Sequence, residues 1–266
     1  MDENPKQMAV DRFGPMVGPW TSLDVITQHA TDPPLVVESL LDALRPAAQP
    51  GATICELGFG PGWLLDPMRR AFPDCCIAGL DLSPGMAHAA SAAGDGRTAI
   101  MLGDMERLPF REASLDAIVT CWTLYFMSDI DAAIEGMRRC LKPGGTFVAA
   151  TVAADNMLEY EELGIEAART IGLTPPPDMG KRFDLDNGAA YVGRHFDDVE
   201  TRDWRGEMVI RDLEPLLQLW TPYGPELPAD EKGRAFEVFR DLAAARLQRD
   251  GELRITRHSG AFIAHA

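Results

Sequence analysis

Short apolar runs alternate with stretches of helical spacing between residues 50 and 152. Apolar runs of strand length lie at 52–56, 75–81, 98–102, 114–122 and 146–152. Helix-like stretches lie between some of them, at about 63–72 and 131–141. Strands that alternate with helices pack as a mostly parallel sheet with helices on both faces. The pattern therefore predicts an α/β fold built on a doubly wound sheet.

The pattern is less regular after residue 152 but remains organised. It predicts an acidic helix from Met157 to Leu163, a helix from near Asp184, a strand at about 199–204, a helix at about 230–249 and a last strand at 252–264. The connection between the last two strands should emerge at the carboxyl edge of the sheet. Ligands bind at that edge in open α/β sheets, so this connection is the predicted lid.

The first predicted strand ends in a carboxylate and leads directly into alternating glycines, Glu56-Leu57-Gly58-Phe59-Gly60-Pro61-Gly62. Because glycine has no Cβ, this backbone can turn tightly, adopt positive φ and approach a nucleotide closely. The dinucleotide fingerprint G-x-G-x-x-G/A requires a small residue at position 63 or 65, where this chain has Trp63 and Leu65. A nicotinamide or flavin site is therefore the second interpretation, and E-x-G-x-G-x-G is the pattern to explain.

Two further carboxylates follow predicted strands. Asp81 ends the second strand about 20 residues beyond the glycines, where a carboxylate can accept hydrogen bonds from ribose hydroxyls. It could also cap a helix that begins at Ser83 and Pro84, and the two roles are compatible. Asp104 follows the third strand, within the sequence Gly-Asp-Met-Glu-Arg-Leu-Pro-Phe at 103–110. Taken alone, Asp104 would fit a turn residue equally well.

The glycine turn, the two acids and the Leu-Lys-Pro-Gly-Gly turn at 141–145 resemble, in order and spacing, the class I S-adenosylmethionine-dependent methyltransferases, in particular their small-molecule, type 11-like branch. The resemblance covers about residues 50–152. It implies a seven-stranded Rossmann-like sheet with an antiparallel last strand and a helical cover. It also implies S-adenosyl-L-methionine as methyl donor, with Glu56 orienting the methionine part and Asp104 meeting the adenine amino group.

The resemblance also sets the expected domain organisation and donor contacts. We expect one domain over 1–266, with an N-terminal cover at 8–45, the donor-binding core at 50–152 and the remaining strands and lid at 153–266. In the family such a cover usually folds over the substrate; an amphipathic helix packed on the sheet is the alternative. The expected donor contacts are Glu56, Gly58, Gly60, Gly62, Asp81, Leu82, Asp104, Met105, Thr120 and Trp122.

The segment from Thr120 to Phe126 follows the fourth strand, where the transferred methyl group would point. Family members that methylate amide or adenine nitrogens usually carry Asn or Asp, two prolines and an aromatic residue there, and this chain does not. We hypothesise that Trp122 and Tyr125 line the donor and acceptor pocket, with core packing as the alternative. Tyr125 and His29, the latter as general base, are the candidate catalytic residues. The remaining histidines are expected to be structural or exposed: His88, His195, His258 and His265.

Charge and cysteine content narrow the classes of partner. The 266 residues carry a formal charge of −16 and a pI of about 4.7, so nucleic acids and anionic membranes would be repelled. Five cysteines without C-x-x-C spacing predict small buried thiols in a reducing compartment rather than a disulfide or zinc framework. The acidic start of the chain lacks the apolar core of a signal peptide, and no stretch reaches the length of a membrane span. We expect a cytoplasmic protein, and methyl transfer itself requires no metal.

Three classes of function follow from these observations. The first is methyl transfer to a small, largely apolar or aromatic metabolite of secondary metabolism, because the lid regions offer Trp20, Trp220 and Tyr223 rather than basic residues. The second is a methyltransferase-fold protein that binds the donor but catalyses another reaction such as cyclisation, or serves as a binding subunit. The third is a nicotinamide oxidoreductase. The sequence leaves open the acceptor, its attacking atom and a homodimer.

Overall fold

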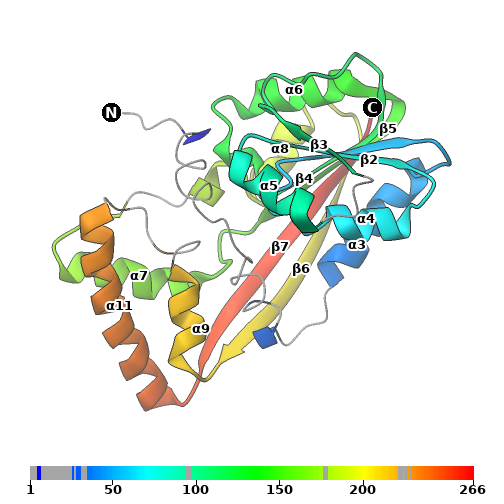
Figure 1. Cartoon of the computed structure of the whole chain (residues 1–266). Helices are drawn as coiled ribbons and strands as arrows, with labels where there is room; N and C mark the ends of the chain where they lie inside the picture. The colour runs from blue at the N-terminus through cyan, green and yellow to red at the C-terminus, as the bar shows by residue number, and fades with distance from the viewer. Residues whose placement is uncertain are drawn as a thin grey trace.

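A seven-stranded sheet forms the centre of the computed structural model, which describes residues 5–6, 26, 28–30, 35–93, 98–175, 179–220, 224, 227 and 229–266 (Figure 1). The strands are β1 (Thr53–Leu57), β2 (Cys76–Asp81), β3 (Ala99–Leu102), β4 (Leu115–Cys121), β5 (Leu141–Val152), β6 (Val199–Ile210) and β7 (Leu253–His265). They are ordered β3-β2-β1-β4-β5-β7-β6, and β7 runs antiparallel to both of its neighbours. The predicted fold class, with its antiparallel last strand, is confirmed.

The strands β1 to β5 lie in residues 50–152, which we call the donor half, and they begin and end close to their predicted bounds, except at the start of β5. Leu141 already pairs with Leu115, and the register then shifts so that Thr146 pairs with Ala117. The predicted glycine turn is therefore an irregularity within β5 rather than a loop before it. Gly144, with φ of +76°, supplies the left-handed conformation that this irregularity needs.

Helices cover both faces of the sheet. On one face lie α3 (Leu35–Leu44), α4 (Leu65–Ala71) and α5 (Pro84–Ala93), and on the other α6 (Ile130–Cys140) and α8 (Gly188–Val192). The described residues also form short 3-10 turns: η1 (Arg45–Ala47), η2 (Leu124–Phe126) and η3 (Met179–Arg182). Alternate residues of β1 enter the two cores, with Ile54 beneath α3 and α4 and Cys55 beneath α6. We call these the α3 core and the α6 core.

The helix α6 shows how local sequence places these covers. Its buried residues follow helical spacing, with Ile130, Ala133, Ile134 and Met137 all at most 5% exposed. Asp129 caps the helix, since its Oδ1 accepts a hydrogen bond from the Ala132 amide at 3.0 Å. This amphipathic, capped segment packs on β4 and β5 and so fixes the loop that precedes it.

The strands β6 and β7, which are joined by residues 211–252, continue beyond the rest of the sheet as a long antiparallel pair (Figure 1). We call this pair the hairpin. β7 pairs with β5 only over 259–265, whereas it pairs with β6 over 253–264. The helices α7 (Leu158–Thr170), α9 (Leu213–Gln218) and α11 (Ala229–Asp250) pack at the projecting half of this hairpin. We call these three helices the cap. As predicted, the connection between β6 and β7 lies on the carboxyl side of the sheet, because β6 runs parallel to β5.

The cap has a hydrophobic core of its own, and this corrects one expectation. Trp220 is 6% exposed, and its ring centroid lies 4.8 Å from that of Phe239. Packing between α9 and α11 therefore takes up this ring, which is not offered to a substrate. Trp20, Tyr223 and most of the predicted cover at 8–45 lie outside the described residues.

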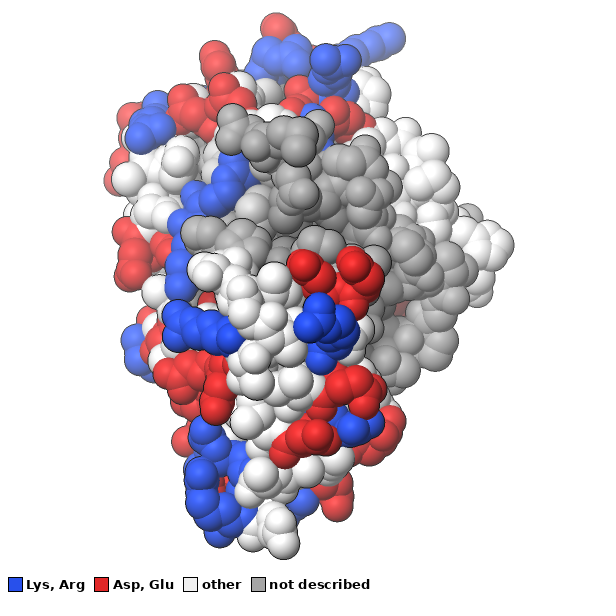
Figure 2. Space-filling model, turned by 90° about the vertical axis from the view of Figure 1, so that its left-hand side faces the viewer, with Lys and Arg blue, Asp and Glu red and all other residues white. Residues whose placement is uncertain are grey.

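Acidic and basic side chains alternate over the side of the molecule where α7 and α11 lie (Figure 2). Along α11, Arg240 pairs with Glu237 and Asp241, and Arg249 with Asp250. These are exposed pairs, which contribute little to stability individually. They leave the visible described surface of the cap without a large patch of positive charge.

The cysteines are all free, and they differ in burial. Cys55, Cys121 and Cys140 are buried, as expected of small apolar residues. Cys76 is exposed and Cys75 is partly exposed, because β2 begins at the surface, so the expectation of burial is wrong for this pair. Within the described ranges, no helix combines the length and the apolar character needed to cross a bilayer.

Candidate functional site

The glycine turn joins β1 to α4 at the carboxyl end of the sheet. φ is +71° at Gly58, +55° at Gly60 and +88° at Gly62, conformations that side chains rarely adopt. A Cβ on Gly58 would lie 2.5 Å from Cγ2 of Thr123, so a larger residue cannot be accommodated without movement. At Gly60 no atom lies within 4 Å of the corresponding position. The turn is therefore pressed against the β4 loop on one side and open on another, as a ligand-binding turn requires.

Glu56 lies two residues before this turn and is 0% exposed. Neither of its carboxyl oxygens has a hydrogen-bond partner among the described residues. Burial raises the pKa of Glu56 well above its usual range, and the charge of Asp81 raises it further. Leaving a buried polar group unpaired costs about 1–3 kcal/mol. A cationic ligand group would supply the partner, so Glu56 fits the ammonium group of a bound methionine moiety.

Asp81 ends β2 directly beside the glycine turn. Its two carboxylate oxygens accept hydrogen bonds from the amides of Gly60 and Ser83, each at 2.8 Å. Burial raises the pKa of Asp81, and these amide bonds offset part of that rise. The Ser83 hydroxyl accepts a bond from the Met86 amide at 3.3 Å, so Ser83 rather than Asp81 caps α5. Asp81 thus shapes the turn, and its contact with ribose stays a prediction.

Asp104 follows the end of β3, the neighbour of β2. One carboxylate oxygen accepts a bond from the Glu106 amide at 2.9 Å, and the other lies 2.8 Å from the ammonium nitrogen of Lys6. Burial alone would raise the pKa of Asp104, but the hydrogen bonds from Lys6 and Glu106 hold it below its usual value. Three carboxyl groups therefore lie at or near the ends of adjacent strands β1, β2 and β3. Lys6 could not be identified from the sequence, because nothing local marks a partner 98 residues away.

The other predicted donor contacts have different surroundings. Leu82 is 40% exposed and offers an apolar surface beside Asp81. Met105 is 5% exposed and belongs to the α6 core, so its side chain is not available and only its main chain could meet a ligand. Thr120 is 1% exposed, with a hydroxyl lacking a described partner. Thr120 pairs with Leu57, so alternation places its side chain on the sheet face opposite to that of Glu56.

Trp122 follows β4 with a left-handed backbone, φ +53°, which is rare for a bulky residue. Its ring centroid lies 5.1 Å from that of Trp63, which comes directly after the glycine turn. Both rings are partly buried against the α3 core. Non-glycine residues in this conformation cluster at functional sites, where the surrounding structure imposes the strain. In the sequence, Trp63 only excluded the dinucleotide spacing, and nothing local marked it as a neighbour of Trp122.

Tyr125 lies in η2, and its ring packs against Phe126 with centroids 4.6 Å apart. Its carbonyl oxygen accepts a hydrogen bond from Arg182 of η3, which fixes this loop against the segment after α7. Tyr125 packs on the α6 core, whereas Trp122 packs on the α3 core. The two aromatic residues predicted to line one pocket therefore belong to opposite faces of the sheet.

His29 is partly exposed and lies beside the β6–β7 hairpin, since the next residue, Ala30, forms a bridge with Met208. Among the described residues, no hydrogen bond or ion pair links His29 to Glu56, Asp81 or Asp104. Its role as a base stays a prediction. His88 and His265 are exposed, as expected, and His195 pairs with Asp131 at 3.2 Å on the surface of α6.

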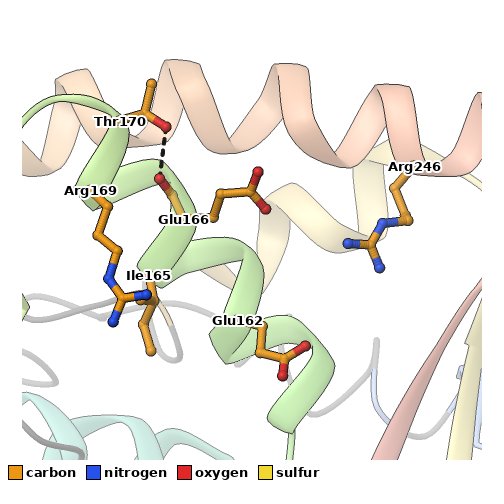
Figure 3. Close-up of a pocket in the computed structure, with 6 residues that line it drawn as sticks. All are labelled: Glu162, Ile165, Glu166, Arg169, Thr170 and Arg246. Carbon is orange, nitrogen blue, oxygen red and sulfur yellow. Dashed lines mark hydrogen bonds between the residues drawn. The ribbon is translucent and has the colours of Figure 1, made fainter.

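A groove of about 640 Å³ lies between α7 and α11 (Figure 3). Its lining consists of Glu162, Ile165, Glu166, Arg169, Thr170 and Arg246. It contains none of the predicted site residues, and acidic and basic groups share its wall. In Figure 3 the side chains of Arg169 and Arg246 come from different helices and do not converge on one point. We therefore regard it as a surface groove of the cap.

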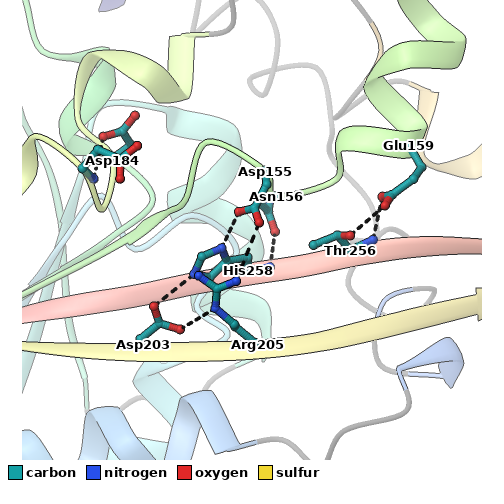
Figure 4. Close-up of polar contacts among 9 residues, drawn as sticks. Asp155, Asn156, Glu159, Asp184, Asp203, Arg205, Thr256 and His258 are labelled. Atoms are coloured by element: carbon teal, nitrogen blue, oxygen red, sulfur yellow. Dashed lines mark hydrogen bonds and ion pairs between the residues drawn. The ribbon is translucent and has the colours of Figure 1, made fainter.

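A polar cluster around the buried His258 lies where the hairpin leaves the sheet (Figure 4). His258 is 5% exposed, and its two ring nitrogens face the carboxylates of Asp155 and Asp203, the latter at 3.1 Å. Arg205 lies 3.4 Å from Asp203 and 3.9 Å from Asp155. Asn156 accepts the amide of His258 at 3.0 Å. Every group here has a partner, so we read the cluster as a structural tie between the loop after β5 and the hairpin.

Comparison with known proteins matches the region of the three acids. A methyltransferase domain family matches residues 55–149, from β1 into β5. Malonyl-acyl-carrier-protein O-methyltransferase of Hahella chejuensis is 31% identical over 121 residues, which cover 44% of this chain and 43% of that enzyme. The chain spans about half or less of the length of the curated relatives that it matches. The residues matched by the family lie within the donor half.

Two solved structures share the fold. The YcgJ protein of Bacillus subtilis has a TM-score of 0.56 at 17% identity, over 86% of this chain and 97% of that one. Phosphoethanolamine N-methyltransferase 2 of Haemonchus contortus, in complex with phosphomonomethylethanolamine and S-adenosylhomocysteine, has a TM-score of 0.58 at 16% identity, over 96% of this chain and 58% of that one. The predicted fold is confirmed, and the match of residues 55–149 to a methyltransferase domain agrees with the family that the motifs predicted.

Proposed function

We propose that this chain, which belongs to the class I S-adenosylmethionine-dependent methyltransferases, transfers a methyl group to a small, largely apolar or aromatic acceptor. The observation that carries the proposal is Glu56. Its carboxyl group is fully buried next to the glycine turn and has no described partner, a costly arrangement unless a ligand completes it.

The three acids match the three polar parts of S-adenosylmethionine. Glu56 would hold the ammonium group of the methionine part, Asp81 the ribose hydroxyls and Asp104 the adenine amino group. Leu82, which is 40% exposed, would pack against the base. The bound donor supplies an activated methyl group on a sulfonium. The chain itself has to bind, orient and shield the reactants, which can account for much of the acceleration.

The aromatic residues beside the glycine turn support an apolar or aromatic acceptor. Trp63 and Trp122 present two partly buried rings there, and Trp122 holds its position despite a strained backbone. Aromatic rings suit flat apolar groups, and they also attract cationic ones. The relatives are named for other acceptors, malonyl-acyl-carrier protein and phosphoethanolamine among them. Because the chain spans under half of the first relative, that name does not fix the acceptor here.

The first test is the identity of the bound nucleotide. Isothermal titration calorimetry should show tight binding of S-adenosylhomocysteine and no binding of NAD. Binding of NAD alone would favour the oxidoreductase interpretation and would remove the proposal. The second test is turnover with a panel of phenols, amines and activated carbon acids, read as formation of S-adenosylhomocysteine. A donor that binds but is never consumed would favour another reaction, such as cyclisation.

The substitution Trp122→Ala tests whether Trp122 lines the donor and acceptor pocket. If the ring lines the pocket, turnover and donor binding should both weaken, while the exposed substitution His88→Gln changes neither. A Trp122→Ala protein that binds and turns over normally would assign Trp122 to packing alone.

The candidate catalytic groups are tested separately. His29→Gln should remove a limb of the pH–rate profile if His29 is the base, and an unchanged profile excludes it. Tyr125→Phe keeps the ring and removes only the hydroxyl, so normal turnover would limit Tyr125 to packing.

The remaining parts of the proposal concern the metabolic role, the cellular location and the partners of the protein. We propose a role in secondary metabolism, a cytoplasmic location and no nucleic-acid partner. The formal charge of −16 supports the absence of a polyanionic partner, and five free cysteines support a reducing compartment. A homodimer is tested by light scattering.

A further inference from the structure

Lys6 joins the start of the chain to the loop after β3. Its ammonium nitrogen lies 2.8 Å from Oδ2 of Asp104 and also forms an ion pair with Glu106. The Lys6 side chain is 16% exposed, and those of Asp104 and Glu106 are 27% and 17% exposed. This is a half-buried triad rather than a surface pair, so solvent screens it less than an exposed salt bridge.

The triad extends to the start of α6. The second carboxylate oxygen of Glu106 accepts the amides of Ser128 and Asp129, the latter at 3.2 Å. Asp129 is the residue that caps α6. Through Glu106, Lys6 is therefore linked to a rigid helix as well as to Asp104.

The charges explain why Lys6 matters to this loop. Asp104 and Glu106 are both acidic, and Asp104 Oδ1 already accepts the Glu106 amide, which holds the two residues close together. Without Lys6, two carboxylates would face each other in a half-buried loop, where like charges repel. The simplest relief is rotation of Asp104 toward solvent.

We propose that Lys6 is a positioning residue for the base of the donor: it holds the Asp104 carboxylate in the orientation that receives the adenine amino group. This inference rests on the proposed function. In this role Lys6 acts through Asp104 and Glu106, and it need not touch the donor itself.

The test measures the selectivity of Asp104 for the base as well as affinity. Wild type, Lys6→Gln and Lys6→Arg are titrated calorimetrically with S-adenosylhomocysteine and with S-inosylhomocysteine, whose base carries a carbonyl in place of the amino group. Lys6→Gln should raise the Kd for S-adenosylhomocysteine about tenfold, the loss expected for a charge-assisted hydrogen bond. The Kd for the inosine analogue should change much less, so the preference for adenine falls. Lys6→Arg should restore most of that preference.

A matched control and a double mutant separate positioning from general loosening. Lys142 forms a comparable ion pair with Asp116, at 2.8 Å. Asp116 lies at the start of β4, at the edge of the sheet opposite to the candidate donor site. Lys142→Gln should leave both Kd values unchanged. In an Asp104→Asn background, Lys6→Gln should have almost no further effect, because the group that it positions is already altered.

The outcomes are distinct. Wild type that fails to bind S-adenosylhomocysteine overturns the proposed function, and this inference with it. Wild type that binds while Lys6→Gln retains both the affinity and the adenine preference overturns the inference alone. An equal loss for the two ligands, which persists in the Asp104→Asn background, also overturns it and assigns Lys6 a structural role.

Discussion

Glu56 and His258 are both buried titratable groups near the carboxyl edge of the sheet, yet their surroundings are opposite. Glu56 is 0% exposed and has no hydrogen-bond partner among the described residues. His258 is 5% exposed, and each of its ring nitrogens faces a carboxylate. One site is electrostatically incomplete within the described chain, whereas the other is complete.

The difference distinguishes a buried group that serves ligand binding from a buried group that serves the stability of the fold. Burying an unpaired polar group costs free energy, so a fold that keeps one needs a ligand to complete it. A fully paired group has no such need, and its removal damages the protein rather than a ligand site. On this reasoning Glu56 serves the donor, while His258 ties the hairpin to the loop after β5.

The strongest test of this comparison is Glu56→Gln, which keeps the shape of the side chain and removes the negative charge that Glu56 would carry opposite a cationic ligand group. Affinity for S-adenosylhomocysteine should fall about 100-fold, since a hydrogen bond to a charged group contributes up to about 3 kcal/mol. The free energy of unfolding of the free protein should change by less than about 1 kcal/mol, because no described partner is lost. Calorimetric titration and urea unfolding measure the two. Glu135→Gln, on the exposed side of α6, is the control.

A large loss of stability without loss of affinity would reverse the assignment of Glu56. It would mean that the protein, and not the donor, completes this carboxyl group.

His258→Gln should give the converse result. The free energy of unfolding should fall by about 1–2 kcal/mol, because at least one carboxylate loses its partner. The loss is limited because Asp155 and Asp203 remain 45% and 49% exposed and can be solvated. Affinity for S-adenosylhomocysteine should stay within about twofold. If affinity fell as far as in Glu56→Gln, the two sites would not be separable as described.

Proton exchange on binding gives a third comparison. Because burial raises the pKa of Glu56 well above its usual range, the free protein retains a proton there at pH values between the usual and the raised pKa, and a cationic ligand group displaces it. Binding should release up to one proton, and affinity should rise by at most about tenfold per pH unit until the raised pKa is reached. Titration in buffers of different ionisation enthalpy measures the release, which should vanish in Glu56→Gln. Identical enthalpies in every buffer would contradict a protonated Glu56.

The same shift predicts an opposite effect on folding. The folded protein binds this proton more tightly than the unfolded chain does, so the contribution of Glu56 to stability decreases as pH rises from its ordinary pKa toward the raised one. Comparison of wild type with Glu56→Gln across this range isolates the effect.

The smallest predicted effect concerns Asp155. Burial alone would raise the pKa of Asp155, but the hydrogen bond and charge of His258 hold it below its ordinary value of 3.8. Its stabilising effect is therefore present above that value and lost as pH falls through the lowered pKa. Asp155→Asn should lower Tm at pH 7 by about 2 °C, and the difference should shrink in strong acid. A difference that grows on acidification would contradict this pairing.

Local sequence predicted the parts of the site that depend on neighbouring residues. Buried parallel strands are continuous apolar runs, so the ends of β1 and β2, and with them Glu56 and Asp81, could be placed in advance. The glycine turn followed from the absence of Cβ atoms. Asp104 also lies where its motif implied, although the side chain of Met105, next to it, is buried in the core.

The missed features depend on contacts between distant segments. Lys6 and Asp104 are 98 residues apart, and no local pattern marks such a pair. Trp63 and Trp122 meet because β1 and β4 are neighbours in the sheet. The cap core needs residues from α7, α9, α11 and the hairpin together, so the burial of Trp220 could not be inferred from its own segment.

The position of β7 has a consequence for how the chain is completed during synthesis. β7 lies between β5 and β6 in the sheet but is translated after both. Until it has left the ribosome, β5 and β6 each present an edge without its final neighbour, and such edges are prone to pair with other chains. The hydrophobic core of the cap also cannot form completely before β7 is translated, because Leu253 and Ile255 of β7 belong to that core. The donor half can form early from nearby segments, whereas the other half depends on a late insertion with long-range contacts, which is intrinsically slow.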